Sequence, residues 1–107
     1  MSLSYTKNVE ILGKPGVARQ LTAGADSLHS STSTALSDNI YRISIIARDA
    51  DIRFSIGQGT QTASNTTSHF IAEGERLDFS VTNGSEIIVI RDSAATADGT
   101  LEVTELG

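Results

Sequence analysis

Cysteine and tryptophan are absent from the 107-residue chain, proline occurs once, and aromatic residues make up only 5% of it. Because there is no cysteine, the chain has neither disulfides nor a thiolate metal site, which excludes a disulfide-stapled secreted mini-protein and suits a reducing cytoplasm. Because aromatic residues are scarce, the core has to be built mainly from Ile, Val and Leu. This composition favours β-strands.

Long apolar runs and clusters of basic residues are absent too. No stretch approaches the ~20 apolar residues that a membrane-spanning helix needs, and the first residues lack the basic and hydrophobic regions of a signal peptide. The formal net charge is −5, and the basic residues are scattered along the chain, whereas binding to a phosphate backbone needs clustered Lys and Arg. We therefore expect neither a membrane nor a nucleic acid among the partners of this protein.

Apolar and polar residues alternate in short segments from Ile40 onward. The alternating segments are 41–45, 52–56, 77–81 and 101–104, and a continuous apolar run occupies 87–90. Such a run is typical of a strand that is covered on both faces. Strands that repeat every ~8–12 residues, with turn residues between them and no 3.6-residue apolar period, predict an all-β chain. We expect a single antiparallel β-sandwich, jelly-roll-like, with essentially no helix.

The first third of the chain differs from the rest, because residues 1–38 are rich in Ser, Thr, Gly and Ala and contain few apolar residues. Pro15-Gly16 fits the central pair of a type II turn between two short extended segments. We predict that residues 1–25 form an extended N-terminal arm or edge strands, ordered partly by contact with another subunit. Residues 26–107 then form the β-sandwich domain.

Within this domain, Phe54, Phe79 and Ile88 are the bulky residues that we expect to point inward and to pack between the two sheets. The polar stretch 25–39 is predicted to be a strand or an arm and not a helix, because Ser and Thr side chains compete for backbone hydrogen bonds. The helix content is therefore predicted to be close to nil.

Two short patterns resemble ligand-binding loops. Asp49 and Asp51 flank Ala50 and would offer two carboxylates to Ca²⁺, but the further oxygen ligands of a calcium loop do not follow, and Asp is a common turn residue. Gly57-Gln58-Gly59 lacks the following helix and the Lys-Ser/Thr pair of a phosphate-binding loop. We interpret the first pattern as a turn and the second as the end of a strand.

The remaining candidates are two histidines and two Asn-x-Ser/Thr sequences. His29 and His69 have no metal-binding spacing and form no Ser-His-Asp set, and we expect His69 to begin a strand. Asn65-Thr66-Thr67 and Asn83-Gly84-Ser85 match glycosylation acceptors, but no secretory signal accompanies them, and Asn83 suits a hairpin turn. We therefore predict no catalytic, cofactor-binding or metal-binding residue, and no enzymatic activity.

From Ile40 onward the chain contains a series of short segments that match a known pattern: Tyr41-Arg42-Ile43, Ala50–Gly57, Phe70–Gly74, Glu75 with Phe79 and Val81, Ile87–Ile90, and Gly99–Glu105. In these segments the chain resembles a family of small proteins encoded among the virion structural genes of tailed bacteriophages. In that family the segments follow a Ser/Thr/Ala-rich lead and are joined by a Thr/Ala-rich connection. The resemblance covers about residues 40–107, and the first 39 residues match only in composition.

The resemblance implies a non-enzymatic structural protein of the virion. Small jelly-roll proteins in phage particles commonly serve as capsid cement or decoration, and others lie at the neck or the tail. We therefore expect a protein that is made in the host cytoplasm and binds the major capsid protein and other copies of itself. On the capsid surface it would stabilise the assembled shell, because repeated copies sum many weak contacts.

Two alternatives stay open. One is a receptor- or glycan-binding β-module on the tail or capsid surface, for which the polar connection 58–68 would be the binding loop, although it lacks the aromatic platform on which sugars usually stack. The other is a small metal-assisted hydrolase of cupin-like fold, which the absence of a His-rich metal motif disfavours.

Overall fold

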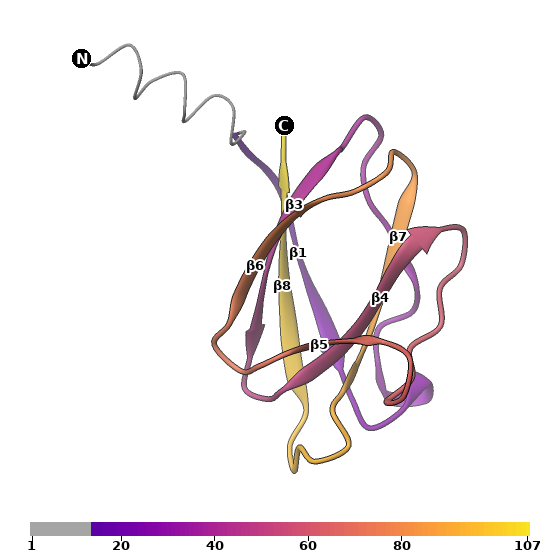
Figure 1. Ribbon diagram of the computed structural model, residues 1–107, viewed down its shortest axis with the longest axis vertical. Helices are drawn as coiled ribbons and strands as arrows, with labels where there is room; N and C mark the ends of the chain where they lie inside the picture. Colours follow the sequence, from indigo (N-terminus) through magenta and orange to yellow (C-terminus); the bar gives the residue numbers. More distant parts are fainter. Residues whose placement is uncertain (1–13) are drawn as a thin grey trace, which may run out of the picture.

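The computed structural model describes residues 14–107, which form two four-stranded antiparallel β-sheets packed face to face (Figure 1). One sheet has the strand order β1-β8-β3-β6 and the other has the order β2-β7-β4-β5. A short 3-10 helix, η1, lies between β1 and β2. The bounds are β1 Pro15–Ala23, η1 Ser27–His29, β2 Thr34–Ala35, β3 Arg42–Arg48, β4 Ile52–Gln58, β5 His69–Ile71, β6 Arg76–Ser80, β7 Ser85–Arg91 and β8 Gly99–Leu106.

The chain crosses from one sheet to the other after every strand except β4. This order is that of a jelly roll, in which two Greek keys wind around one core. The predicted jelly-roll-like antiparallel β-sandwich is therefore confirmed. In residues 14–107 the helical structure is η1 alone, which agrees with the prediction of essentially no helix, and no helix there is long and apolar enough to cross a membrane.

Alternating side chains fill the space between the sheets. Along β8 every second residue is buried, from Gly99 to Glu105, and the residues between them are partly exposed. The buried apolar cluster consists of Leu21, Ala23, Leu36, Ile43, Ile45, Ala47, Ile52, Phe54, Ile71, Ile87, Val89, Leu101 and Val103. Phe79 packs against this cluster, and its ring stacks on that of Phe54 with 5.9 Å between the centroids. The core prediction is therefore confirmed for these two phenylalanines.

Strand β7 is buried on both faces, as its continuous apolar run predicted. Ile87 and Val89 point into the sandwich, whereas Ile88 and Ile90 point outward and yet are only 7% and 5% exposed. The prediction that Ile88 packs between the sheets is wrong. An apolar run without alternation does not indicate which face of the strand a residue occupies. The strand register does: Val89 lies opposite Phe54, which points inward, so the neighbouring Ile88 points outward.

Strand β1 lies within the segment predicted as an arm or edge strands, and it is an edge strand paired with β8 along its length. The predicted type II turn at Pro15-Gly16 is wrong, because Gly16 does not have the positive φ that such a turn requires. Pro15 instead begins the edge strand, where its missing N–H costs no ladder bond. Residues 1–13, with the other predicted extended segment, lie outside the described residues, and the division of the chain at residue 25 stays a prediction.

The polar stretch 25–39 forms less strand than predicted. Only Thr34–Ala35 pair with a neighbour, as β2 against β7, and η1 precedes them. The hydroxyl groups of Ser30 and Ser31 accept hydrogen bonds from backbone N–H groups at the end of β1, both over 2.9 Å. These side chains therefore take the place of a strand ladder, as Ser and Thr commonly do.

Turns follow β3, β5 and β6, and in them Asp49, Gly74 and Gly84 have positive φ angles of 72°, 82° and 82°. A backbone hydrogen bond of 3.1 Å closes the turn of residues 82–85. This turn joins β6 to β7, which belong to opposite sheets, so the predicted hairpin at Asn83-Gly84 is wrong. Turn residues specify a change of direction, but they do not specify which strands pair.

We predict that Phe54→Ala lowers the free energy of unfolding by about 3–5 kcal/mol, because it leaves a cavity at a side chain that is 4% exposed. Phe70→Ala is the control, since Phe70 is 44% exposed, and it should cost about 1 kcal/mol or less. Urea denaturation of both variants checks the difference. Equal losses would contradict the arrangement of the core.

Candidate functional site

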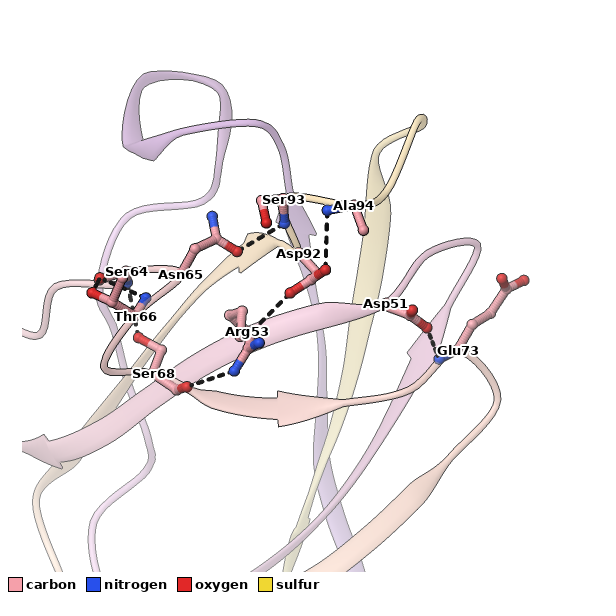
Figure 2. Close-up of polar contacts among 10 residues, drawn as sticks. All are labelled: Asp51, Arg53, Ser64, Asn65, Thr66, Ser68, Glu73, Asp92, Ser93 and Ala94. Atoms are coloured by element: carbon pink, nitrogen blue, oxygen red, sulfur yellow. Dashed lines mark hydrogen bonds and ion pairs between the residues drawn. The ribbon is translucent and has the colours of Figure 1, made fainter.

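The connection between β4 and β5, residues 59–68, runs over the outer face of the sheet that contains β4 and β7 (Figure 2). The Ser68 hydroxyl lies 2.7 Å from the Ser55 hydroxyl and accepts a hydrogen bond of 2.9 Å from Ser64 N. Ser55 lies opposite Ile88 on this outer face. The end of the connection therefore lies on the same outer face as Ile88 and next to the strand that pairs with it.

A group of five residues, which we call the Arg53 cluster, ties this connection to the loop after β7: Arg53, Asn65, Ser68, Asp92 and Ser93. Arg53 Nε donates to Asp92 Oδ1 over 2.9 Å, and its Nη1 donates to Ser68 O over 3.4 Å. Ser93 N donates to Asn65 Oδ1 over 2.8 Å. Figure 2 shows these contacts converging from β4, from the connection and from the end of β7.

Hydrogen-bond donors around Asp92 stabilise the ionised form of its carboxyl group. The Arg53 guanidinium foremost, and then the Ala94 N–H group at 3.0 Å, keep the pKa of Asp92 below its usual range. The Arg53 guanidinium also lies over the Phe70 ring, 4.9 Å from its centroid. The ion pair and the stacked ring fix one side of the connection to the sheet.

The outward surface of the connection consists of hydroxyl groups. Thr62, Thr66 and Thr67 are exposed, whereas the side chain of Asn65, from the predicted glycosylation sequence, is bonded to Ser93. The connection is therefore a fixed surface that offers hydrogen-bonding groups, rather than a pocket that encloses a ligand.

A charged pair that the sequence reasoning missed lies between the sheets. Glu105 is 1% exposed, and its Oε2 atom accepts hydrogen bonds from Arg19 Nη2 over 3.1 Å and from Ser37 N over 2.9 Å. Its Oε1 atom has no hydrogen-bond partner among the described residues. The alternation of Leu101, Val103 and Glu105 was the available signal, since it places all three side chains on one face of β8.

Two opposing effects set the ionisation of Glu105. Burial raises the pKa of its carboxyl group, but the hydrogen bonds from Ser37 and Arg19 outweigh burial and bring the pKa below the usual range of glutamate. The carboxylate is therefore charged at neutral pH and holds β8 against β1 and the segment after β2.

An apolar cleft of about 380 Å³ opens between β5 and β6, the edge strands on one side of the sandwich. It is lined by Phe54, Ile56, His69, Phe70, Leu77 and Phe79. The rings of Phe54 and His69 are 5.4 Å apart between centroids. At this cleft part of the apolar interior reaches the surface.

The predicted turn at Asp49 and Asp51 is confirmed. Asp49 is exposed, and Asp51 Oδ1 accepts a hydrogen bond from Glu73 N over 2.8 Å, as Figure 2 shows. These residues line a shallow hollow at the end of the sandwich, together with the loop 94–97. Within residues 14–107, no group of three or more His, Cys, Asp or Glu is arranged to hold a metal ion.

The other sequence candidates lie apart from one another. His69 begins β5, as predicted, and Gly57-Gln58-Gly59 ends β4, where Gly59 has a φ of 75°. His29 Nδ1 lies 2.6 Å from Asp26 Oδ1 at the surface of η1. The structure therefore does not bring the predicted candidates together into one site.

No family model and no curated protein matches the chain significantly. Among solved structures, hydroxypropylphosphonic acid epoxidase from S. wedmorenis in complex with fosfomycin is similar with a TM-score of 0.52 and 8% identity, over 84% of this chain and 43% of that chain. A de novo designed double-stranded β-helix is similar with a TM-score of 0.51 and 14% identity, over 84% of this chain and 99% of that chain. Tobacco streak virus coat protein gives 0.36 and 13% identity, over 84% and 86% of the two chains.

These comparisons contradict the prediction that the protein is not an enzyme, since an epoxidase has the same fold over most of this chain. The prediction relied on the architecture and on the absence of a motif, and this architecture also serves an enzyme. The chain spans less than half of the epoxidase, and at 8% identity the likeness shows the fold alone.

We predict that Arg53→Met loosens the connection without unfolding the sandwich, because it removes the donors to Asp92 and Ser68. Hydrogen exchange measured by mass spectrometry should speed up about tenfold in residues 61–68, the effect of losing about one net hydrogen bond. Exchange in β3 and β8 should stay unchanged.

Arg48→Met is the matched control, because Arg48 forms an exposed pair with Glu102 at 3.5 Å on the other sheet and should have little effect. Faster exchange throughout the chain in Arg53→Met, or none in the connection, would contradict the role of the Arg53 cluster.

We predict that Glu105→Gln lowers the free energy of unfolding by about 1–3 kcal/mol at pH 7. The pKa of Glu105 is lower in the folded chain than in the unfolded chain, so its stabilising effect is present above the unfolded value of ~4.3 and is lost as the pH falls through the folded value. The difference between the two proteins should therefore shrink as the pH falls below about 4.3.

Urea denaturation at several pH values measures this difference. Glu102→Gln, on the outer face of the same strand, is the control and should change little at either pH. A loss that is independent of pH would show that the charge of Glu105 is not what stabilises the fold.

Proposed function

We propose that the chain is a structural protein of a tailed-phage virion, and that it decorates the capsid and stabilises the assembled shell. The observation that carries this proposal is the position of the resembling segments in the fold. They begin at Tyr41, just before β3, and continue through β4, β5, β6 and β7 to Glu105 in β8. The resemblance thus follows consecutive strands and their turns, which are the parts that determine a jelly roll.

The distribution of side chains also supports the proposal. Apolar residues fill the interior, so the surfaces available to a large partner are the outer sheet faces, the connection 59–68 and the strand edges. The outer face of the β1-β8-β3-β6 sheet is mainly polar, since its central strands carry Arg42, Ser44, Glu102 and Thr104 beside Ile46 and Leu106. A face of this kind suits a reversible contact with a protein surface.

The proposed partners are the major capsid protein and further copies of the chain, and the proposed location is the capsid surface after synthesis in the host cytoplasm. Residues 1–13 lie outside the described residues, and we propose that they serve as the arm toward a neighbouring subunit. Many copies on one shell would sum weak contacts into firm attachment.

We predict that particles carrying the protein withstand heating better than particles without it, because binding to the assembled state stabilises that state by mass action. The measurement compares the temperature at which the two kinds of particle release their contents, while electron microscopy locates the protein. The assembly of the capsid itself should change little when the protein is left out.

Salt gives a second readout for the same particles. If the charge of −5 faces a basic patch of the shell, raising the ionic strength should release the protein, because the Debye length is only ~8 Å at physiological salt. Finding the protein only at the tail, with shell stability unchanged, would refute the capsid role and favour the receptor- or glycan-binding module.

A further inference from the structure

Strand β6, Arg76–Ser80, is a free edge of the sandwich, since it pairs with β3 alone among the described strands. The odd-numbered residues along it face β3, because Ala47 N donates to Glu75 O over 3.2 Å and Val81 N donates to Tyr41 O over 2.8 Å. Backbone groups alternate in direction along a strand. The N–H and C=O groups of the even-numbered residues therefore point away from the sheet.

The even-numbered residues also present side chains of opposite charge. Arg76 and Asp78 are both exposed on the outer face, and neither has an ion-pair partner within residues 14–107. Arg76 Nη1 donates to Ser44 Oγ over 2.7 Å, which holds the guanidinium on this face and leaves its other donors available. An edge with free backbone groups and one charge of each sign can complement itself.

We propose that β6 pairs antiparallel with β6 of a second copy of this chain. Two-fold symmetry requires that the same strand serves on both sides. In one register Arg76 lies opposite Asp78 of the second copy, and by symmetry Asp78 lies opposite Arg76 of the second copy. Both pairs therefore join opposite charges. In the neighbouring register Asp78 lies opposite Asp78 of the second copy, which is unfavourable because like charges then face one another directly.

The favoured register also satisfies the backbone. Arg76 and Asp78 are the residues whose N–H and C=O groups point to the edge, so each pair exchanges two N–H···O hydrogen bonds. Leu77 then lies opposite Leu77 of the second copy at a non-hydrogen-bonded position, where side chains come closest. Charge, backbone direction and apolar contact thus select the same register.

The cleft between β5 and β6 adds an apolar surface to this edge. Leu77 and Phe79 of β6 line it, and so does Phe70, which is 44% exposed. The Leu77 side chain of the second copy would lie next to the cleft and remove part of it from water. The interface would join the two β1-β8-β3-β6 sheets into one continuous sheet.

Sedimentation over a range of protein concentrations tests the pairing. Asp78→Arg and Arg76→Asp should each weaken dimerisation about tenfold or more, because each replaces two attractive pairs by two repulsive ones. The double variant Arg76→Asp/Asp78→Arg should restore the dimer. Asp38→Arg makes the same change of charge in the segment before β3 and should leave dimerisation unchanged.

Hydrogen exchange of the unaltered protein gives an independent readout. The amides of Arg76 and Asp78 should become protected as the concentration rises, whereas that of Leu77, which faces β3, should be protected throughout. A wild-type monomer, a dimer that the single variants do not weaken, or a double variant that stays monomeric would each overturn the proposal. The pairing does not depend on the virion role, because these measurements use the isolated chain.

Discussion

Every strand of this sandwich has to direct alternate side chains into one narrow space between two sheets, and most of the structure follows from that constraint. β8 satisfies it most fully, because it pairs with β1 on one side and with β3 on the other and buries Leu101 and Val103 between them. The jelly-roll winding interleaves strands that are distant in sequence. It leaves β6 and β5 as edges on one side, where the core reaches the surface.

The period-two patterns predicted the fold class, and they identified Phe54 and Phe79 as core residues. They could not assign Ile88, because a run of apolar residues carries no alternation and β7 is covered on both faces. The strand pairings were equally out of reach, since Asn83-Gly84 forms its turn between opposite sheets. The architecture does not specify an activity either, as the likeness to an epoxidase demonstrates.

The partners of the buried polar side chains could not be predicted from the sequence either. Alternation alone would have placed Glu105 inside, with Leu101 and Val103, but its partners Arg19 and Ser37 are 86 and 68 positions away. Arg53 and Asp92, in turn, are 39 positions apart. Which distant residues meet is determined by the winding of the chain, and a single sequence carries no local signal for it.

The position of the connection on the outer face of the sheet bears on how this protein would aggregate. Ile88 and Ile90 belong to a short apolar segment of high β-propensity, and the connection lies on the same outer face of the sheet. Detaching the connection breaks no strand pairing of β7, so a nearly native molecule would expose more of this apolar outer face to other molecules. Aggregation would then follow the opening of the connection and not global unfolding, and a chain with a well-formed core could still precipitate.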